Sequence, residues 1–266
     1  MGKVIAVANQ KGGVGKSTTT VNLSAYLGTR DKKILCIDMD AQGNATTGFG
    51  IQKRNLTCSS YEVLTGKARI KDAILETEFA HVSLIPADAD LAGAETELVN
   101  MEQRFNRLKM QILTIKKKYD YIFIDCPPAL GQVTINAMTA CDEVLIPMLA
   151  EYYALEGLTQ LMNTMKLVRV NYNSKLEVCG ILFTMYDNRL NVSKQVVEEV
   201  KKYFPDKVFE AKIPRNVRLS EAPSYGKPIL YYDKHSKGAL AYELFGKEFL
   251  GEPLSSLTKL RMNIAK

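Results

Sequence analysis

The sequence predicts an α/β fold in which helices flank both faces of a doubly wound, mostly parallel β-sheet. Short apolar runs alternate with segments of helical periodicity along most of the 266 residues. Several runs, such as 122–124 and 144–146, are apolar at consecutive positions, as strands are when helices cover both faces of their sheet. Glycine-rich or acidic turns follow three of these runs, at the strand ends where ligands bind in such sheets.

Each predicted strand is a short apolar run that stops at a polar residue, a glycine or a proline. The run at 3–8 leads into a glycine-rich turn, and the run at 33–38 ends in an aspartate. The run at 121–125 stops before Pro127-Pro128, which cannot continue a strand ladder. By the same criteria, further strands are expected at 82–86, 143–147 and 178–183.

Each predicted helix repeats apolar residues at helical spacing between or after the strands. The first covers 16–27 and stops near Gly28, a residue that favours helix ends. The others are expected at 91–102, 105–118, 155–170, 193–203 and 238–250. This alternation and the length of the chain predict a single domain over 1–250, followed by a C-terminal tail over 251–266.

The charge of the chain is unevenly distributed. In total, 35 basic and 29 acidic residues give a net charge of +6. Residues 1–188 contain 20 of each kind, whereas residues 189–266 contain 15 basic and 9 acidic residues. A basic C-terminal third suggests a surface for a polyanion or an acidic membrane, although solvated lysine-rich helices would give the same composition.

Composition excludes several classes of protein. No apolar run approaches the roughly 20 residues of a membrane span, and the N-terminal run is too short for a secretory signal. The five cysteines form no C-x-x-C pair, which argues against a disulfide framework, a zinc ribbon or a local iron–sulfur motif. We therefore expect a cytoplasmic protein.

The turn after the first strand has the pattern of a phosphate-binding loop. Residues 9–18 read N-Q-K-G-G-V-G-K-S-T and lead directly into a predicted helix. Glycines let successive backbone N–H groups face a phosphate, and a helix N-terminus favours anions. Lys16 would reach the β- and γ-phosphates of a nucleotide, and the Ser17 hydroxyl would ligate Mg²⁺. The general P-loop pattern starts with glycine, and this chain departs from it at Gln10.

Three aspartates follow predicted strands. An aspartate at the tip of an apolar strand is costly to bury unless it serves a cation or a polar network. Asp125 suits the Mg²⁺-holding position, directly or through water. Asp38 and Asp40 are candidates to orient or activate an attacking water. For any one of them, a helix cap or a turn is the structural alternative.

Taken together, these motifs resemble the ParA/MinD family of ATPases. K-G-G-V-G-K-S at 11–17 has the family's deviant Walker A pattern, and D-M-D-A-Q-G-N and I-D-C-P-P follow at 38–44 and 124–128. Segments 151–158, 184–187 and 214–228 are similar to the Soj/ParA branch, which partitions DNA. The resemblance extends from about residue 3 to 250.

The resemblance implies a P-loop ATPase that needs ATP and Mg²⁺ and forms a homodimer with two sandwiched ATP molecules. Lys11 would cross to the partner's nucleotide, Asp40 would activate the hydrolytic water, and Asp125 would be the Walker B aspartate, with Asp38 behind the metal. No N-K-x-D guanine motif is present, which favours ATP over GTP. The residues implied to bind nucleotide are Lys11, Gly12, Gly13, Val14, Gly15, Lys16, Ser17, Thr18, Pro214 and Asn216, the last two at the adenine.

The resemblance also implies that the ATP-bound dimer binds double-stranded DNA of the nucleoid without sequence preference. A ParB/Spo0J-like partner would stimulate an otherwise weak hydrolysis and release the DNA, so that a chromosome or plasmid is segregated. Because the P-loop starts at residue 11, we expect no helix-turn-helix domain before it and no operator-specific binding. Arg189 matches a DNA-binding position of the family, and the further candidates are Arg218, Lys234, Lys237 and Lys247.

Two other functions remain as alternatives. A MinD-like membrane ATPase that positions cell division would use an amphipathic tail; Leu257, Leu260 and Ile264 have helical spacing, but no Phe or Trp anchors them, so no membrane binding is expected. A metabolic or electron-transfer relative would need a second substrate pocket or paired cysteines. Cys126 beside the nucleotide motif has no such pair.

Overall fold

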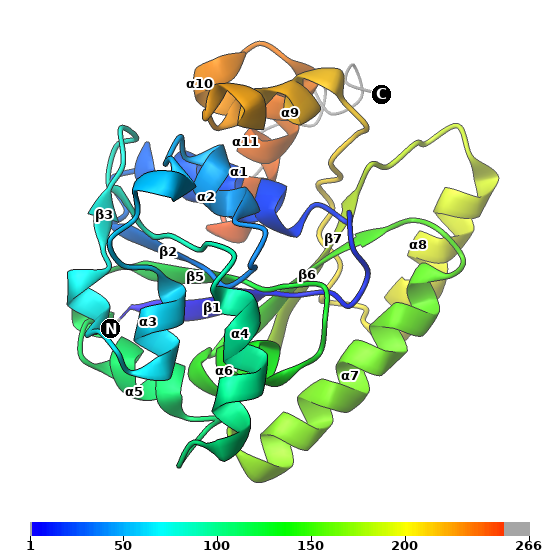
Figure 1. Cartoon of the computed structure of the whole chain (residues 1–266). Coiled ribbons are helices and arrows are strands. Elements are labelled where there is room, and N and C mark those ends of the chain that lie inside the picture. Colours follow the sequence, from blue (N-terminus) through cyan, green and yellow to red (C-terminus); the bar gives the residue numbers. More distant parts are fainter. Residues whose placement is uncertain (1, 253–266) are drawn as a thin grey trace.

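A seven-stranded sheet forms the centre of the protein in the computed structural model, which describes residues 2–252 (Figure 1). The strand order is β3-β4-β2-β5-β1-β6-β7. All neighbouring strands are parallel except β3, which pairs antiparallel with β4. The predicted fold class is therefore confirmed. The strands are β1 Lys3–Val7, β2 Ile34–Asp38, β3 Leu75–Glu76, β4 Val82–Ile85, β5 Tyr121–Asp125, β6 Glu143–Leu149 and β7 Glu177–Thr184.

Helices cover both faces of the sheet and bury two apolar cores. One core lies beneath α1 and α11, and the other lies against α3 to α8 (Figure 1). The helices are α1 Lys16–Gly28, α2 Asn44–Gly48, α3 Ser60–Thr65, α4 Leu91–Glu97, α5 Arg107–Leu113, α6 Gln132–Ala140, α7 Ala154–Asn171, α8 Asn191–Tyr203, α9 Val217–Glu221, α10 Ile229–Tyr232 and α11 Lys237–Phe249. Short 3₁₀ turns are η1 Lys53–Asn55, η2 Ile70–Asp72, η3 Leu98–Asn100, η4 Lys116–Lys118 and η5 Ala222–Tyr225.

The structure differs from the predicted helices in length and in number, since α2, α3, α6, α9 and α10 fall outside the predicted ranges. The helices expected at 91–102 and 105–118 are shorter, and between them Gln103 adopts a left-handed φ of 50°, which interrupts any continuous helix. Helix α6 was not predicted. It buries Thr134, Asn136 and Thr139 together with its apolar residues, so its sequence lacks the polar face that marks an amphipathic helix.

The strand register brings the phosphate-binding loop and the two segments that carry the candidate aspartates to one edge of the sheet. Val7 at the end of β1 and Asp38 at the end of β2 are both register partners of Asp125 at the end of β5. Because the three strands are parallel, the loops that follow them leave from the same edge. This arrangement is the structural basis of the site described below.

The basic C-terminal part attaches to this sheet without adding a strand to it within the described residues. All seven strands end by Thr184. Beyond them, Val208 and Pro214 form single parallel bridges to Ile181 and Tyr186, and α8 and α11 pack on opposite faces (Figure 1).

The segment after α2 packs directly against the segment after α9. Gly50 and Gly226 both have left-handed φ angles, 77° and 61°, and a Cβ on Gly226 would lie 2.5 Å from the Gly50 Cα. Nearby, the Ile229 amide donates to Asn22 Oδ1 of α1 at 2.6 Å. Residues 216–232 are thus fastened to α1 and to the segment that follows α2.

No helix within residues 2–252 is long and apolar enough to cross a membrane. The possible amphipathic positions of the tail, Leu257, Leu260 and Ile264, lie outside the described residues.

Close packing between α1 and α11 generates a stability prediction. A Cβ on Gly246 would lie 2.0 Å from Cδ1 of the buried Tyr26 ring. We expect Gly246→Ala to lower the free energy of unfolding by about 1–3 kcal/mol, although alanine favours a helix, because the ring must shift within a packed core. Urea denaturation measures the change.

Gly93→Ala in α4 is the matched control. There the nearest atom to an added Cβ is Glu97 Oε1 at 3.8 Å, an ordinary contact. This variant should be neutral or more stable by about 0.5–1 kcal/mol. Equal denaturation midpoints for the two variants would contradict the steric explanation.

Candidate functional site

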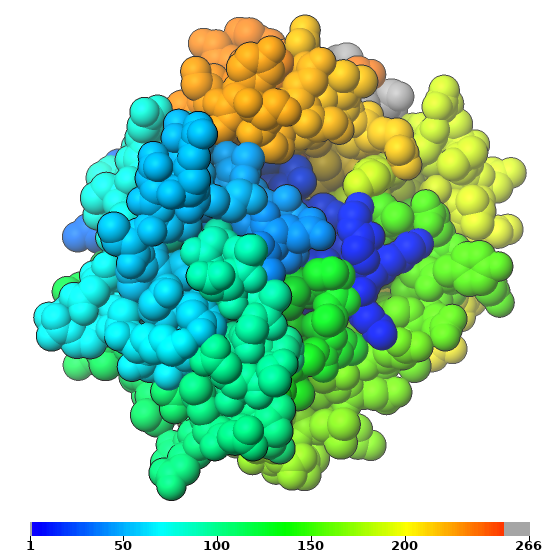
Figure 2. Space-filling view, viewed as in Figure 1, coloured from blue at the N-terminus to red at the C-terminus, as the bar shows by residue number. Residues whose placement is uncertain are grey.

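The loop between β1 and α1 is shaped by glycine backbone conformations and by hydrogen bonds from two side chains, one in the loop and one at the end of β7. Gly13 and Gly15 have left-handed φ angles of 70° and 84°, which favour glycine. Thr184 Oγ1 donates to the Val14 carbonyl at 2.8 Å, and Asn9 Nδ2 donates to the Pro147 carbonyl at 2.8 Å. The loop is therefore anchored to β6 and β7, and Gly12 and Gly13 are exposed. This part of the chain is dark blue in Figure 2.

The remaining loop residues continue into α1. The Cβ of Pro128 lies 3.9 Å from where a Gly12 side chain would begin. Ser17 and Thr18 lie in the first turn of α1, which has no side-chain cap of its own, so N–H groups at this helix start are available to an anion.

The two lysines of the loop occupy different environments. Lys16 is only 7% exposed, and its Nζ donates to the Lys11 carbonyl at 3.2 Å. Burial lowers the pKa of the Lys16 ammonium group, partly opposed by Asp125. The Lys11 side chain is 40% exposed and forms a 3.0 Å ion pair with Glu151. Lys16 is thus buried against the loop backbone, whereas Lys11 lies at the exposed edge of the loop.

Asp38 is buried, and both of its carboxylate oxygens accept hydrogen bonds from its own loop. Its Oδ1 accepts from the Asp40 amide at 3.1 Å, and its Oδ2 accepts from the Thr46 amide at 2.8 Å and the Thr46 hydroxyl at 2.7 Å. Burial raises the pKa of Asp38 to about 6, against the effect of these hydrogen bonds. The carboxylate therefore shapes the 38–46 loop, and Thr46 in turn accepts from the Ala87 amide at 2.9 Å.

One carboxylate oxygen of Asp125 has no hydrogen-bond partner in the described part of the chain. Its Oδ1 accepts from Thr20 Oγ1 at 3.3 Å, whereas its Oδ2 is buried and has no hydrogen-bond partner among residues 2–252. Burial and then the nearby Asp38 raise the pKa of Asp125 well above its usual range, opposed by the Ser17 hydroxyl and the Lys16 charge. A divalent cation between Ser17 and Asp125 would favour the ionised carboxylate and give Oδ2 a partner.

The oxygen donors of Ser17 and Asp125 suit Mg²⁺ better than a metal that is held by protein ligands alone. Within the described part of the chain, no three His, Cys, Asp or Glu side chains could hold a metal together. Mg²⁺ commonly takes one or two protein ligands and completes its shell with water and substrate phosphates. Ser17 and Asp125 would supply that protein share.

Asp40 lies at the edge of the buried cluster. It is 9% exposed, and its Oδ1 accepts from the Gln42 amide at 3.0 Å. The loop is tied back on its outer side, where Lys53 Nζ donates to the Gln42 carbonyl at 2.5 Å. Asp40 is thus placed close to the other aspartates, and it borders solvent from which a water could enter.

Pro214 and Asn216 lie beside the end of β7. Pro214 bridges to Tyr186, two residues beyond the Thr184 that anchors the phosphate-binding loop. Asn216 caps α9, and its Oδ1 accepts from the Leu219 amide at 3.2 Å. The structure thus brings the expected adenine segment to the same edge of the sheet as the loop.

The two arginines predicted to contact DNA are paired with carboxylates. Arg189, 84% exposed after β7, makes a two-pronged contact with Asp187 in which the shortest N–O distance is 2.6 Å. Arg218 on α9 contacts Glu221 at 2.9 Å and Asp233 at 3.5 Å. Both guanidinium groups are accessible, and both are partly neutralised in this state.

The three predicted lysines are not gathered in one place. Lys237 and Arg189 line one groove of about 1360 Å³ between the β7–α8 turn and the 210–217 segment. Lys234 and Lys237 have no ion-pair partner within residues 2–252. Lys247 pairs with Glu243 at 2.6 Å and lies about 15 Å from Lys237 along α11. The groove therefore unites only part of the predicted set.

Several residues that build the site were not predicted. Asn9, Thr20, Thr46 and Thr184 fix the loops or the aspartates through the hydrogen bonds given above. Thr46 lies outside the recognisable motifs, and Thr184 begins the 184–187 segment, but a lone threonine carries no sequence signal of this role. Thr20 and Asn9 flank the phosphate-binding loop, so their positions were the available hint.

Comparisons with known proteins match this geometry. A family model described as an AAA domain matches residues 2–178. The chain is 54% identical over 248 residues to the sporulation initiation inhibitor protein Soj of Bacillus subtilis (strain 168), covering 93% of this chain and 98% of that protein. It is 50% identical over 250 residues to the chromosome partitioning protein ParA of Myxococcus xanthus (strain DK1622), covering 94% and 88%.

Solved structures agree. The crystal structure of cobyrinic acid a,c-diamide synthase from Mycobacterium smegmatis with bound ADP and magnesium has a TM-score of 0.82 and 35% sequence identity, covering 94% of each chain. The resemblance expected from the motifs is confirmed by the full-length sequence matches. The chain belongs to the Soj/ParA branch of the ParA/MinD family of ATPases.

Proposed function

We propose that this protein is a DNA-partitioning ATPase that uses ATP and Mg²⁺. The observation that carries the proposal is the unpartnered Asp125 Oδ2, buried beside Ser17 and Lys16 at the end of a phosphate-binding loop. The names of the Soj and ParA relatives support the partitioning role, and the ADP- and magnesium-bound neighbour supports the ligands. Residues 1–250 would act as one ATPase domain.

The P-loop residues would bind and orient the nucleotide. The backbone N–H groups of residues 12–18 would contact the phosphates, Lys16 would neutralise the β- and γ-phosphates, and Ser17 and Asp125 would hold Mg²⁺. Mg²⁺, when bound, neutralises phosphate charge that develops during transfer. Pro214 and Asn216 would contact the adenine.

Lys11 would act in the second subunit. Its ion pair with Glu151 is exposed on both sides, and exposed pairs contribute only about 0–1 kcal/mol. Exchanging Glu151 for the triphosphate of a partner subunit therefore costs little, and an added positive charge would stabilise the transition state. ATP binding would thus favour a sandwich dimer.

Asp40 would activate the attacking water, with Asp38 holding its loop. We expect weak intrinsic hydrolysis, because Lys11 must arrive from another chain before the phosphate charge is fully stabilised. A ParB/Spo0J-like partner would raise the rate and reset the cycle.

The ATP-bound dimer would bind double-stranded DNA through phosphate contacts and so associate with the nucleoid in the cytoplasm. The groove that contains Arg189 and Lys237 supports this surface, and Arg218 and Lys234 are its further candidates. Such contacts carry no base sequence information and are sensitive to salt.

Asp40→Ala should separate ATP binding from hydrolysis. Loss of a general base should lower the hydrolysis rate by about 10²–10⁴-fold, while ATP still produces a dimer that binds DNA. Phosphate release, light scattering and DNA titration with ATP and ADP measure the three steps. Lys16→Ala is the control and should weaken ATP binding by about 10–100-fold. An Asp40→Ala protein that hydrolyses ATP normally would refute the assigned role.

Arg189→Ala should reduce DNA binding and leave ATP hydrolysis and dimerisation intact. Each subunit would lose one phosphate contact, so the slope of log affinity against log salt should fall by about 0.9 per subunit. DNA-binding titrations with ATP at several salt concentrations measure it. An unchanged slope would place the DNA surface elsewhere.

Asp187→Asn should have the opposite effect. This change removes the negative charge that Arg189 now contacts at 2.6 Å and keeps an oxygen of similar size. We expect tighter DNA binding in the same titration, and no gain in the Arg189→Ala background. A gain that persists without Arg189 would show that Asp187 acts by general repulsion of DNA.

A further inference from the structure

The segment between β5 and α6, residues 126–131, borders the phosphate-binding loop and has few backbone anchors of its own. Pro127 and Pro128 have no N–H to donate. At its start, the Cys126 amide donates to the Val7 carbonyl at 3.1 Å. Pro128 lies next to Gly12, as described above. In its middle, the Thr134 hydroxyl of α6 donates to the Ala129 carbonyl at 2.5 Å. The position of this segment therefore depends on the end of β5 and on where α6 begins.

Glu95 of α4 fixes the far end. Its Oε2 accepts from the Gln132 amide at 2.8 Å, and its Oε1 accepts from the Val133 amide at 3.2 Å. The Gln132 side chain donates in return to the Glu95 carbonyl at 2.7 Å. The first N–H groups of a helix lack intrahelical partners and favour an anion, and α6 has no side-chain cap from its N-cap residue. Glu95 supplies that cap from another helix.

Gly131 makes room for this carboxylate. A Cβ at this position would lie 2.5 Å from Glu95 Oε1 and 2.7 Å from Oε2. The backbone of Gly131 has φ −83° and ψ −166°, an extended conformation open to any residue. Space for Glu95 therefore limits this position, and backbone conformation does not.

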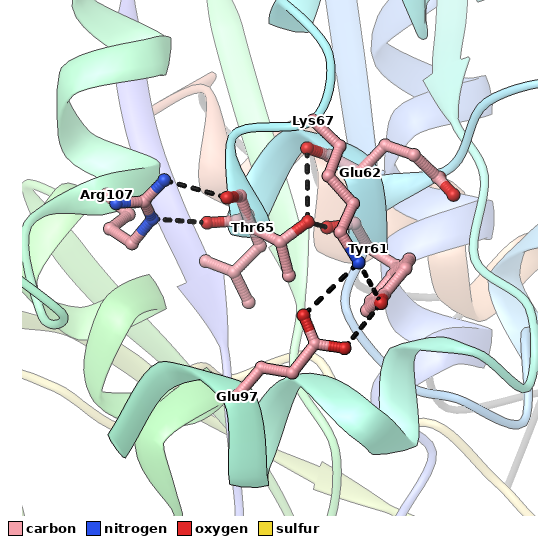
Figure 3. A network of polar contacts seen from close by, with 7 residues as sticks. Tyr61, Glu62, Thr65, Lys67, Glu97 and Arg107 are labelled. Atoms are coloured by element: carbon pink, nitrogen blue, oxygen red, sulfur yellow. Dashed lines mark hydrogen bonds and ion pairs between the residues drawn. The ribbon is translucent and has the colours of Figure 1, made fainter. Parts of the chain in front are cut away.

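A second carboxylate of α4 serves a separate contact. Glu97 accepts from the Tyr61 hydroxyl at 2.5 Å and pairs with Lys67 at 3.2 Å, both on the α3 side (Figure 3). It holds α4 against the neighbouring segment, and within residues 2–252 it makes no hydrogen bond to α6. Glu97 is therefore a matched comparison for Glu95, two residues away in the same helix.

We propose that Glu95 is a positioning residue for ATP hydrolysis: by capping α6, it sets where residues 126–131 lie between Asp125 and the phosphate-binding loop. The proposal rests on the ATPase function proposed above. Glu95 itself touches neither nucleotide nor metal in this assignment. It acts through the segment that follows the Mg²⁺-holding carboxylate, so it should affect the chemical step more than ATP binding, which depends on the loop and Lys16.

The kinetic test compares Glu95→Ala, Glu95→Gln and Glu97→Gln in the full chain. Glu95→Ala should lower kcat about tenfold with KM for ATP within twofold, because a small displacement near the reacting groups affects rate strongly. Glu95→Gln keeps an acceptor oxygen and should recover part of the rate. Glu97→Gln should keep wild-type kcat. Equal losses in Glu95→Ala and Glu97→Gln would reduce Glu95 to a general stabilising residue and overturn the proposal.

Gly131→Ala tests the same contact from the other side. It displaces the carboxylate without removing it, so its effect on kcat should resemble that of Glu95→Ala. In the Glu95→Ala background, Gly131→Ala should add less than a twofold further loss, because the atoms that clash are gone. Full additivity of the two losses would overturn the proposal.

Hydrogen exchange gives a readout that does not depend on activity. The Gln132 and Val133 amides should lose protection in Glu95→Ala and keep it in Glu97→Gln. Retained protection in a Glu95→Ala protein overturns the capping role. An inactive wild-type protein would refute the proposed ATPase function, whereas an active wild type with an equally active Glu95→Ala variant would refute only the role of Glu95.

Discussion

The unpaired oxygen of Asp125 is the constraint on which the rest of the site depends. A buried polar group without a partner typically costs about 1–3 kcal/mol, and a buried charge costs more. The protein places this group at the end of a central strand, with β1 and β2 as its register neighbours. Since those strands are parallel, the phosphate-binding loop and the Asp38 loop must meet there too. In the proposed function, a cation bridged to phosphate would relieve this cost.

Differences in burial and hydrogen bonding also give the three aspartates different roles. Asp38 is saturated by three donors from its own loop, so it holds backbone in place. Asp125 keeps one oxygen without a hydrogen-bond partner within residues 2–252, and Asp40 remains at the solvent boundary. The difference lies in what surrounds each group: the residue type is the same in all three. Lys16, largely buried among them, supplies the compensating positive charge.

The parts of this molecule that follow local rules could be predicted from sequence. The strands, the phosphate-binding loop and the aspartates at strand ends each have a signal within a short stretch of sequence. The sheet register then brings these segments together. The different roles of Asp38 and Asp125 depend on their hydrogen-bond partners. Thr46 lies eight residues after Asp38 without a motif that marks it, and only the fold brings Thr20 close to Asp125. Helix α6 was missed because its buried threonine and asparagine hide its periodicity. The cap from Glu95 has no local sequence signal because its partners, Gln132 and Val133, lie about one-seventh of the chain away.

The contact between Gly50 and Gly226 has a consequence for the range of sequences that this fold can accept. Each glycine is required twice, once because its φ angle is left-handed and once because the other backbone fills the space of a side chain. A compensating change at one position cannot rescue the other, since shrinking a neighbour is impossible when the neighbour is already glycine. These two positions should therefore admit no alternative amino acid in any library of functional variants. They form a fixed point between the segment that follows Asp40 and the segment that follows Asn216, around which the exposed residues remain free to diversify.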